Sequence, residues 1–428
     1  MNVLIIGYVW PEPNSSAAGS RMMQLITAMR NQDWNITFAS PAQHSEHAVD
    51  LEALGISQKN IELNNVSFDE YISELNPDIV IFDRFMMEEQ FGWRVEKFCP
   101  NAMRILNTED LHSLRDARQL AIKKGYDFDI SNPDHLAQYL HTDLAIREVA
   151  SIFRIDLTLM ISPVEVSLLI EHFQVPHQQV MYLPFMLESI HENDISMLPK
   201  FNDRAHFISI GNFRHAPNWD VVLYLKQSVW PLIRKKIPHA ELHIYGAYPP
   251  PKATQLHNKQ QGFLVKGWAE DAKEVIKNAR VLLAPIRFGA GIKGKLTDSM
   301  MCGTPSITTQ IGTEGMLPRD DENQPKWNGH VINLHEMMED PSLFADAAIE
   351  AYQNENMYSQ MQQNGFEIIN QLYNSPHWQG QFIDRLILQK KELISLRKNN
   401  FFGLMLRHHS MKSTQYMAQW IEAKNTKA

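Results

Sequence analysis

Short apolar segments alternate with helix-like segments along most of the chain, and this alternation restricts the fold more than any other feature of the sequence. The strand patterns lie at residues 2–7, 36–39, 79–82, 104–107 and 157–161, and again at 206–210, 242–245, 263–265, 281–284 and 306–308. Helical patterns fall between them, as at residues 21–30 and 133–153. Strands that alternate with helices form parallel sheets covered on both faces, so the sequence predicts an α/β fold.

The alternation is interrupted once, around residues 184–204, which hold two prolines and mixed charges without a sustained period. A chain of 428 residues is also longer than one ordinary hydrophobic core requires. We therefore expect a first domain at residues 1–185, a linker at 186–204 and a second domain at 205–375. Residues 376–428 are expected to form a long helix followed by a tail.

Charge and cysteine content narrow the class of protein. The formal net charge of −9, from 40 basic and 49 acidic residues, argues against non-specific binding to nucleic acid. Cys99 and Cys302 lie far apart and outside any zinc-binding spacing, which fits a reducing compartment. The N-terminus lacks the features of a signal peptide, and no apolar run approaches the ~18 residues that cross a bilayer. We expect a cytoplasmic protein.

A glycine-rich loop follows the strand pattern at residues 281–284 and leads into a short helical run. Glycines at such a place let backbone N–H groups approach an anion, and the helix N-terminus adds its dipole. Lys293 and Lys295 add positive charge. Lysines two positions apart point to different faces of a helix, so we expect one of the two to face the anion. The loop therefore predicts a phosphate site.

The segment at residues 288–315 resembles the donor site of glycosyltransferase family 4, whose enzymes have the two-domain GT-B fold. The resemblance is carried by Gly291-Ile292-Lys293, Asp298, Cys302-Gly303-Thr304-Pro305 and Gly312-Thr313-Glu314-Gly315. The chain departs from the commoner family pattern in having Asp298 in place of glutamate, and Ala290 where a second glutamate is frequent. The resemblance implies two Rossmann-like domains, an interdomain cleft, and a C-terminal helix that crosses back to the first domain.

The resemblance also implies roles for residues of the second domain. The expected donor-binding residues are Arg214, Gly291, Ile292, Lys293, Asp298, Gly312 and Glu314. Of the two lysines it selects Lys293 for the diphosphate, beside Arg214, whose planar fork suits that group. Asp298 is expected to accept the ribose hydroxyls. Two simpler interpretations remain open: Arg214 pairs with Asp220, and Asp298 only complements the helix dipole.

In the first domain, polar residues follow the strand pattern at residues 104–107. The family has a histidine or an acid at this strand end to hold the transferred sugar, so Asp110 and His112 are the catalytic candidates. Helix capping by Asp110 is the alternative. Ala18 and Gly19 resemble the family's small-residue loop, which offers backbone N–H groups to donor and acceptor. An ordinary surface loop is the alternative for them.

No metal and no cofactor are expected. Asp127-Phe128-Asp129 spells the acidic triplet of metal-dependent glycosyltransferases of another fold, but it does not directly follow a strand, so we interpret it as a solvated turn. A GT-B site neutralises the leaving diphosphate with arginine, lysine and helix dipoles. The nucleotide-sugar is then a substrate.

The resemblance implies a retaining, metal-independent glycosyltransferase that moves a sugar from a nucleotide-sugar to the hydroxyl of a carbohydrate or lipid-linked acceptor. By analogy, surface-polysaccharide biosynthesis is the expected setting. Two alternatives remain: a nucleotide-sugar epimerase of the same fold, and a catalytically inactive sugar-nucleotide-binding subunit. The sequence identifies neither the nucleobase nor the sugar.

The tail after Arg397 mixes large apolar side chains such as Phe401 and Trp420 with basic ones such as Lys412. This composition is typical of an interfacial segment that binds the inner face of a membrane peripherally. A helix packed on the body of the protein explains the same composition. The sequence leaves both interpretations open.

Overall fold

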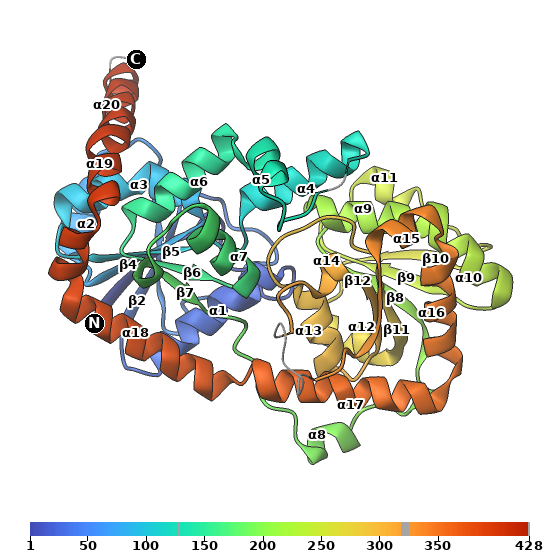
Figure 1. The fold of residues 1–428 in the computed structure, drawn as a ribbon. Helices are drawn as coiled ribbons and strands as arrows, with labels where there is room; N and C mark the ends of the chain where they lie inside the picture. Colours follow the sequence, from blue (N-terminus) through green and yellow to red (C-terminus); the bar gives the residue numbers. More distant parts are fainter. Residues whose placement is uncertain (127, 318–324, 427–428) are drawn as a thin grey trace.

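The computed structural model describes residues 1–126, 128–317 and 325–426, which form two α/β lobes (Figure 1). The first lobe holds a seven-stranded sheet with the order β3-β2-β1-β4-β5-β6-β7, and the second a six-stranded sheet with the order β10-β9-β8-β11-β12-β13. All neighbouring strands in both sheets run parallel. The predicted α/β fold with two Rossmann-like domains is confirmed.

The strands have the following bounds: β1 (Asn2–Ile6), β2 (Asn35–Ser40), β3 (Ser57–Asn60), β4 (Ile79–Asp83), β5 (Met103–Asn107), β6 (Leu157–Met160), β7 (Val180–Tyr182), β8 (Ala205–Ile210), β9 (Leu242–Tyr245), β10 (Phe263–Gly267), β11 (Ala279–Ala284), β12 (Ser306–Thr309) and β13 (Gly329–Ile332). Three of them, β3, β7 and β13, have no counterpart among the predicted strands. All three lie at the edge of a sheet, and β3 and β13 contain no fully buried residue. An edge strand does not need the run of apolar residues that marks a central strand.

The helices of the first lobe cover both faces of its sheet: α1 (Ala17–Arg30), α2 (Ser67–Leu75), α3 (Phe85–Phe98), α4 (His112–Lys124), α5 (Pro133–Leu140), α6 (Asp143–Arg154) and α7 (Pro163–Ser167), which continues into the π-helical turn η1 (Leu168–His172). We expected one helix over residues 133–153, but the chain breaks at His141. Thr142 begins α6 as its N-cap, since its hydroxyl accepts a hydrogen bond of 3.3 Å from the N–H of Ala145.

The second lobe contains α9 (Ala216–Tyr224), η4 (Leu225–Val229), α10 (Trp230–Lys236), α11 (Pro251–Thr254), α12 (Ala272–Asn278), α13 (Gly294–Met301), α14 (Gln310–Thr313), α15 (Leu334–Glu339), α16 (Ser342–Gln353) and α17 (Glu355–Leu372). Between β7 and β8 the chain forms the 3₁₀ turn η3 (Phe201–Asp203) and the short helix α8 (Glu192–Ser196), which lies below the second lobe in Figure 1.

The long helix α18 (Ser375–Asn399) leaves the second lobe and runs along the first (Figure 1). Its buried residues Phe382, Leu386 and Leu393 pack in one cluster with Val3 and Ile5 of β1. The predicted crossover helix is therefore confirmed. The chain continues into α19 (Phe401–Leu406), η5 (Arg407–Met411) and α20 (Lys412–Thr426). Within the described residues, no helix is both long and apolar enough to cross a membrane.

Each sheet reverses its strand order at one place, between β1 and β4 in the first lobe and between β8 and β11 in the second. Ligands of open α/β sheets bind in the crevice outside the carboxyl ends of the strands at such a reversal. The loops that follow β1, β4, β8 and β11 all contribute residues to one cavity between the lobes. The topology thus brings two reversal points together at a shared site.

Candidate active site

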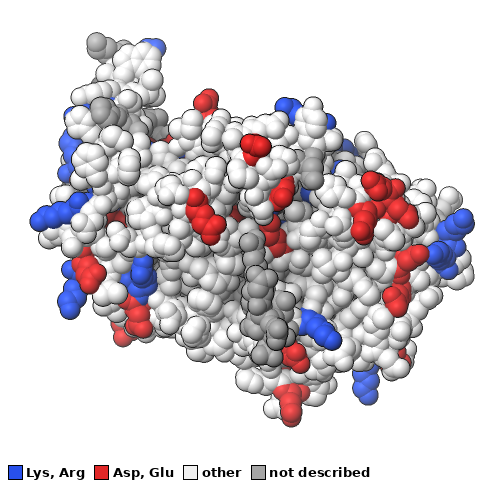
Figure 2. All heavy atoms as spheres, in the orientation of Figure 1, with Lys and Arg blue, Asp and Glu red and all other residues white. Residues whose placement is uncertain are grey.

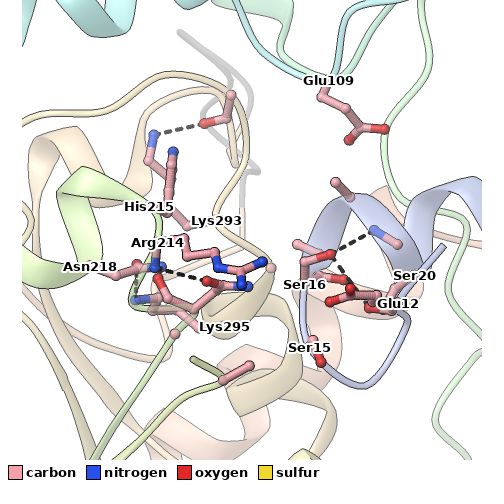
Figure 3. Close-up of a pocket in the computed structure, with 18 of the residues that line it drawn as sticks. Glu12, Ser15, Ser16, Ser20, Glu109, Arg214, His215, Asn218, Lys293 and Lys295 are labelled. Carbon is pink, nitrogen blue, oxygen red and sulfur yellow. Dashed lines mark hydrogen bonds between the residues drawn. The ribbon is translucent and has the colours of Figure 1, made fainter. Parts of the chain in front are cut away.

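A cleft of about 700 Å³ lies between the two lobes, a volume in the range of small-molecule sites. Figure 3 shows the loop before α1, with Glu12, Ser15 and Ser16, on one side of it. Arg214 and Lys295 project from the other side, which belongs to the second lobe. A ligand in the cleft would therefore contact both lobes at once.

Three cationic side chains of the second lobe line the cleft: Arg214, Lys293 and Lys295. The guanidinium of Arg214 lies 3.5 Å from the centroid of the Tyr248 ring. Asp220, which we considered as its partner, instead forms a bidentate pair with Arg287. The simple interpretation of Arg214 as the partner of Asp220 is therefore not what the structure shows.

Both lysines line the cleft, and the expectation that one of them faces the anion stays a prediction. Lys293 is the N-cap of α13 and has extended backbone angles, so the helical spacing behind that expectation does not apply to it. Its Nζ donates to the carbonyl of Gly291 at 2.7 Å, and the Nζ of Lys295 donates to Oδ1 of Asn218 at 2.7 Å. Burial lowers the pKa of each lysine to about 8.

The N-terminus of α13 lies beside these lysines. No side chain caps it. The N–H of Leu296 donates to the carbonyl of Lys293 at 2.8 Å, which leaves the N–H groups of Gly294 and Lys295 for a ligand. Asp298 lies one turn further along the helix and also lines the cleft. Burial raises the pKa of Asp298 to about 6, so its carboxyl is ionised at neutral pH and can accept hydrogen bonds from hydroxyl groups.

Gly291 lies at one of the places where the two lobes approach each other closely, and Gly294, where a Cβ would lie 2.6 Å from that of Ala17, is another. The φ of Gly291 is +65°, and a Cβ there would lie 2.9 Å from the Cβ of Asp110, so glycine is required on both grounds. Its N–H does not face the site, because it donates to Oε1 of Glu165 in the first lobe at 2.8 Å. The neighbouring Ile292 is buried and also lines the cleft. Of the glycine-loop residues, Gly291 therefore shapes the contact between lobes.

Asp110 and His112 come together on the first-lobe wall, with Nε2 of His112 at 3.8 Å from Oδ1 of Asp110. Asp110 also pairs with Arg115. Burial alone would raise the pKa of Asp110, but the charge of Arg115 lowers it well below its usual range. Burial lowers the pKa of His112 to about 4. At neutral pH the site therefore presents an ionised aspartate next to a neutral imidazole.

Asp110 does not cap α4, which was the alternative for it. The N-cap position is Leu111, and the N–H groups of His112 and Ser113 donate to the carboxylate of Glu148 in α6, each at 2.9 Å. Because α6 supplies the capping group, the Asp110 carboxylate pairs instead with Arg115 and lies beside His112 on the cleft wall. Glu148 did not stand out in the sequence, since it lies inside an ordinary amphipathic helix pattern.

Glu109 is a cleft residue that the sequence analysis did not single out. Its φ of +65° is unusual for a residue other than glycine, and such strain collects at functional sites. Burial, together with the charge of Asp83, raises the pKa of Glu109 to about 7, and the buried Arg21 opposes that rise. The three polar residues that follow β5 indicated a site at this strand end. That pattern did not show whether Glu109 or Asp110 would line the cleft.

Ala18 and Gly19 lie at the start of α1 and line the cleft. The N–H of Gly19 is taken by the hydroxyl of Ser16, the N-cap, at 3.0 Å. A Cβ at Gly19 would lie 2.4 Å from the carbonyl of Glu12, so this glycine lets the preceding loop fold back on the helix. The first turn of α1 thus faces the cleft, with Ala18 rather than Gly19 positioned to offer its N–H.

Gly312 and Glu314 do not line the cleft as the structure describes it. Gly312 lies in α14, where its N–H donates to the hydroxyl of Thr309 at 3.3 Å. Glu314 accepts two hydrogen bonds of 2.7 Å from the guanidinium of Arg118 in α4. Arg118 also donates to the carbonyl of Gly289 at 2.8 Å. Glu314 therefore joins the second lobe to the first. The sequence around Glu314 could not indicate this role, because its partner Arg118 lies far away in the chain.

Two further contacts cross the cleft near its mouth. The hydroxyl of Tyr248 donates to the carboxylate of Glu12 at 2.8 Å, and Nε1 of Trp268 donates to the carbonyl of Asn14 at 3.2 Å. Together with the Arg118–Glu314 pair they join the two lobes directly.

Within residues 1–126, 128–317 and 325–426, no group of three or more histidine, cysteine, aspartate or glutamate side chains is arranged to hold a metal ion. Asp127, the first residue of the acidic triplet, lies outside the described residues.

Residues 204–354 match the family model described as "Glycosyl transferases group 1". No curated protein matches the chain in sequence. Similar solved structures include HepE from Anabaena, with 10% identity and a TM-score of 0.62 over 90% of this chain and 98% of that one. TarM from S. aureus has 10% identity and a TM-score of 0.64 over 90% and 99%. Sucrose-phosphate synthase from Thermosynechococcus elongatus has 15% identity and a TM-score of 0.61 over 91% and 100%. At these identities the likeness concerns the fold, which is GT-B.

Proposed function

We propose that this glycosyltransferase of the GT-B fold moves a sugar from a nucleotide-sugar to an acceptor hydroxyl within the cleft between its lobes. The observation that carries the proposal is the cationic wall formed by Arg214, Lys293 and Lys295 beside the uncapped N-terminus of α13. Such a wall suits a diphosphate, whose negative charge grows as the bond to the sugar breaks. The family model matched by the second lobe is one of transferases, which favours transfer over an epimerase or an inactive subunit.

The donor would lie with its ribose hydroxyls on Asp298 and its diphosphate on the cationic wall. The sugar would then reach toward the first-lobe wall, where Asp110 and His112 lie. The neutral His112 can exchange hydrogen bonds with sugar hydroxyls, and the ionised Asp110 can accept them. Glu109, with a pKa of about 7, lies on the same wall and suits contacts with the acceptor.

We further propose that the reaction proceeds with retention of configuration and without a metal ion. Arginine, lysine and helix dipole together supply the charge that a metal would otherwise supply. In this scheme the donor phosphate helps to deprotonate the acceptor hydroxyl. Nuclear magnetic resonance of the product's anomeric proton reports the stereochemistry, and turnover that persists in EDTA supports independence from metal.

The solved relatives suggest which substrates to try. A HepE structure holds UDP and glucose, and a TarM structure holds UDP and α-GlcNAc-glycerol. UDP-sugars are therefore the first donors to test, with carbohydrate or lipid-linked carbohydrate acceptors, in keeping with a place in polysaccharide biosynthesis.

A thermal-shift screen against UDP-, GDP-, ADP- and dTDP-sugars tests the donor assignment, because a ligand that binds only the native state raises the melting temperature. We expect one nucleotide class to raise it and the Arg214→Ala variant to lose most of that rise. A chain that no nucleotide-sugar stabilises would contradict the proposal.

A further inference from the structure

The C-terminal tail, defined here as α19, η5 and α20, is fixed to the first lobe along one face. Nδ2 of Asn400 donates to the carbonyl of Phe153 at the end of α6 at 2.8 Å, and Nη1 of Arg407 donates to the carbonyl of Arg154 at 3.0 Å. Met411 and Ala418 pack in a small buried cluster with Trp93 of α3. The tail is thus a docked helix.

The opposite face of the tail exposes large hydrophobic side chains. Phe401 is 71% exposed, Phe402 62% and Trp420 56%. The full set of exposed large hydrophobic residues on the tail is Phe401, Phe402, Leu404, Met405, Tyr416, Met417 and Trp420. Phe401 and Met405 are four positions apart, as are Tyr416 and Trp420, so each pair shares one side of the helix. A docked helix that leaves this many aromatic side chains in water presents a surface for binding.

The charges around this face have one predominant sign. Lys412 and Lys424 of the tail are exposed, as is Lys398 just before it at the end of α18. The ammonium of Lys424 lies 4.4 Å from the centroid of the Trp420 ring. Glu422, the acid among residues 398–426, is held in an ion pair by Arg94 of α3. The chain as a whole carries −9, so a basic segment stands apart from the rest of the molecule.

We infer that the tail binds the surface of a membrane that contains anionic phospholipid. Aromatic side chains flanked by lysines are the combination that inserts at the lipid headgroup boundary, where the rings enter the acyl region and the ammonium groups meet phosphate. In Figure 1 α20 projects beyond the first lobe, and Figure 2 shows the visible side of this projection without acidic red. The projection gives the apolar face access to a flat surface that the rounded body alone does not offer.

The test is co-sedimentation of the full chain with vesicles of phosphatidylcholine alone and of phosphatidylcholine mixed with phosphatidylglycerol. We expect binding to the mixed vesicles that weakens as salt is added, because screening reduces the attraction of lysines for phosphate. The double variant Phe401→Ser/Trp420→Ser should lower the affinity at least about tenfold, since both rings would insert. Lys412→Glu/Lys424→Glu should lower it by about tenfold or more on the mixed vesicles.

Met197→Ser is the matched control, because Met197 is 77% exposed but lies just after α8, beside the second lobe. This variant should sediment like the unchanged chain. If the Phe401→Ser/Trp420→Ser variant fails to fold, the Lys412→Glu/Lys424→Glu variant decides the matter, because it alters only exposed side chains. Equal sedimentation of all variants would overturn the inference. A second outcome would also overturn it: light scattering without lipid shows a dimer, and the Phe401→Ser/Trp420→Ser change dissociates that dimer. The exposed face of the tail would then bind a second copy of the chain.

Discussion

At the scale of single residues, burial shifts the pKa of the charged groups to which we assign the donor. Lys293 and Lys295 both have a pKa of about 8, and Asp298 has a pKa of about 6. The two lysines are useful to a diphosphate in their protonated form, and Asp298 is useful to ribose in its ionised form. Between about pH 6 and pH 8, therefore, the two lysines are protonated and Asp298 is ionised, which is the state that suits the donor.

This arrangement predicts different pH profiles for two ligands. Affinity for the nucleoside diphosphate should fall as the pH drops through about 6, when Asp298 gains a proton, and again as it rises through about 8, when the lysines lose theirs. The bare nucleoside should show the acid limb alone, because it carries no phosphate. Calorimetric titration across pH measures both profiles. Asp298→Asn is the control that should abolish the acid limb, and an alkaline limb for the nucleoside would refute the assignment.

The sequence located cleft residues where the signal is local, while the roles assigned to them stay predictions. Arg214, Lys293 and Asp298 all line the cleft, because Arg214 follows β8, and Lys293 and Asp298 lie at the start and in the middle of α13, which follows β11. Glu165 and Arg118 were missed, because their partners Gly291 and Glu314 lie on the other lobe. No local pattern indicates a hydrogen bond between residues separated by more than a hundred positions.

At the scale of elements, the glycine loop before α13 forms a contact between the lobes, beside the role in phosphate binding that we propose for it. The strands around it were predictable because central parallel strands are buried runs of apolar residues. The polar edge strand β3, with the sequence SQKN, was not predictable, because only its backbone pairing with β2 makes it a strand. The glycine loop itself was recognised, but its closeness to Asp110 depends on how the lobes meet.

Gly291→Ala tests this contact, with Gly125→Ala as the matched control. Both glycines have φ near +65°, at +65° and +68°, but a Cβ at Gly125 meets nothing within 4 Å. Each change should cost about 1–2 kcal/mol for the left-handed backbone, measured by urea denaturation. Gly291→Ala should in addition reduce donor turnover, because its Cβ would push Asp110 away. Equal effects of the two variants on turnover would show that the contact has no functional role.

At the scale of the whole molecule, contacts between the lobes bring the two walls of the cleft together. The Arg118–Glu314 pair is the clearest link, with side chains 5% and 17% exposed. The hydrogen bond from Tyr248 to Glu12 also joins the two lobes across the cleft. The proposed function therefore predicts that binding and transfer depend on residues that do not touch the substrate.

A double-mutant cycle on Arg118→Ala and Glu314→Gln measures the link. We expect each single change to raise KM for the donor, and the two to be coupled by about 0.5–3 kcal/mol, because the residues bond directly. Lys236→Ala/Asp346→Ala is the control, since that ion pair lies on the surface of the second lobe with both side chains more than half exposed. Additive effects at Arg118 and Glu314 would mean that the pair does not hold the lobes together.

The central claim is that the cationic wall of the second lobe holds the donor diphosphate during sugar transfer. The most direct measurement is release of nucleoside diphosphate from the nucleotide-sugar that stabilises the chain, compared between the unchanged protein and Arg214→Ala, Lys293→Ala and Lys295→Ala. A charge-assisted hydrogen bond contributes about 1.5–3 kcal/mol, so each change should slow turnover by about one to two orders of magnitude, while Met197→Ser leaves it unchanged. Turnover by all three alanine variants at the unchanged rate, or no turnover by the unchanged protein with any nucleotide-sugar, would contradict the account.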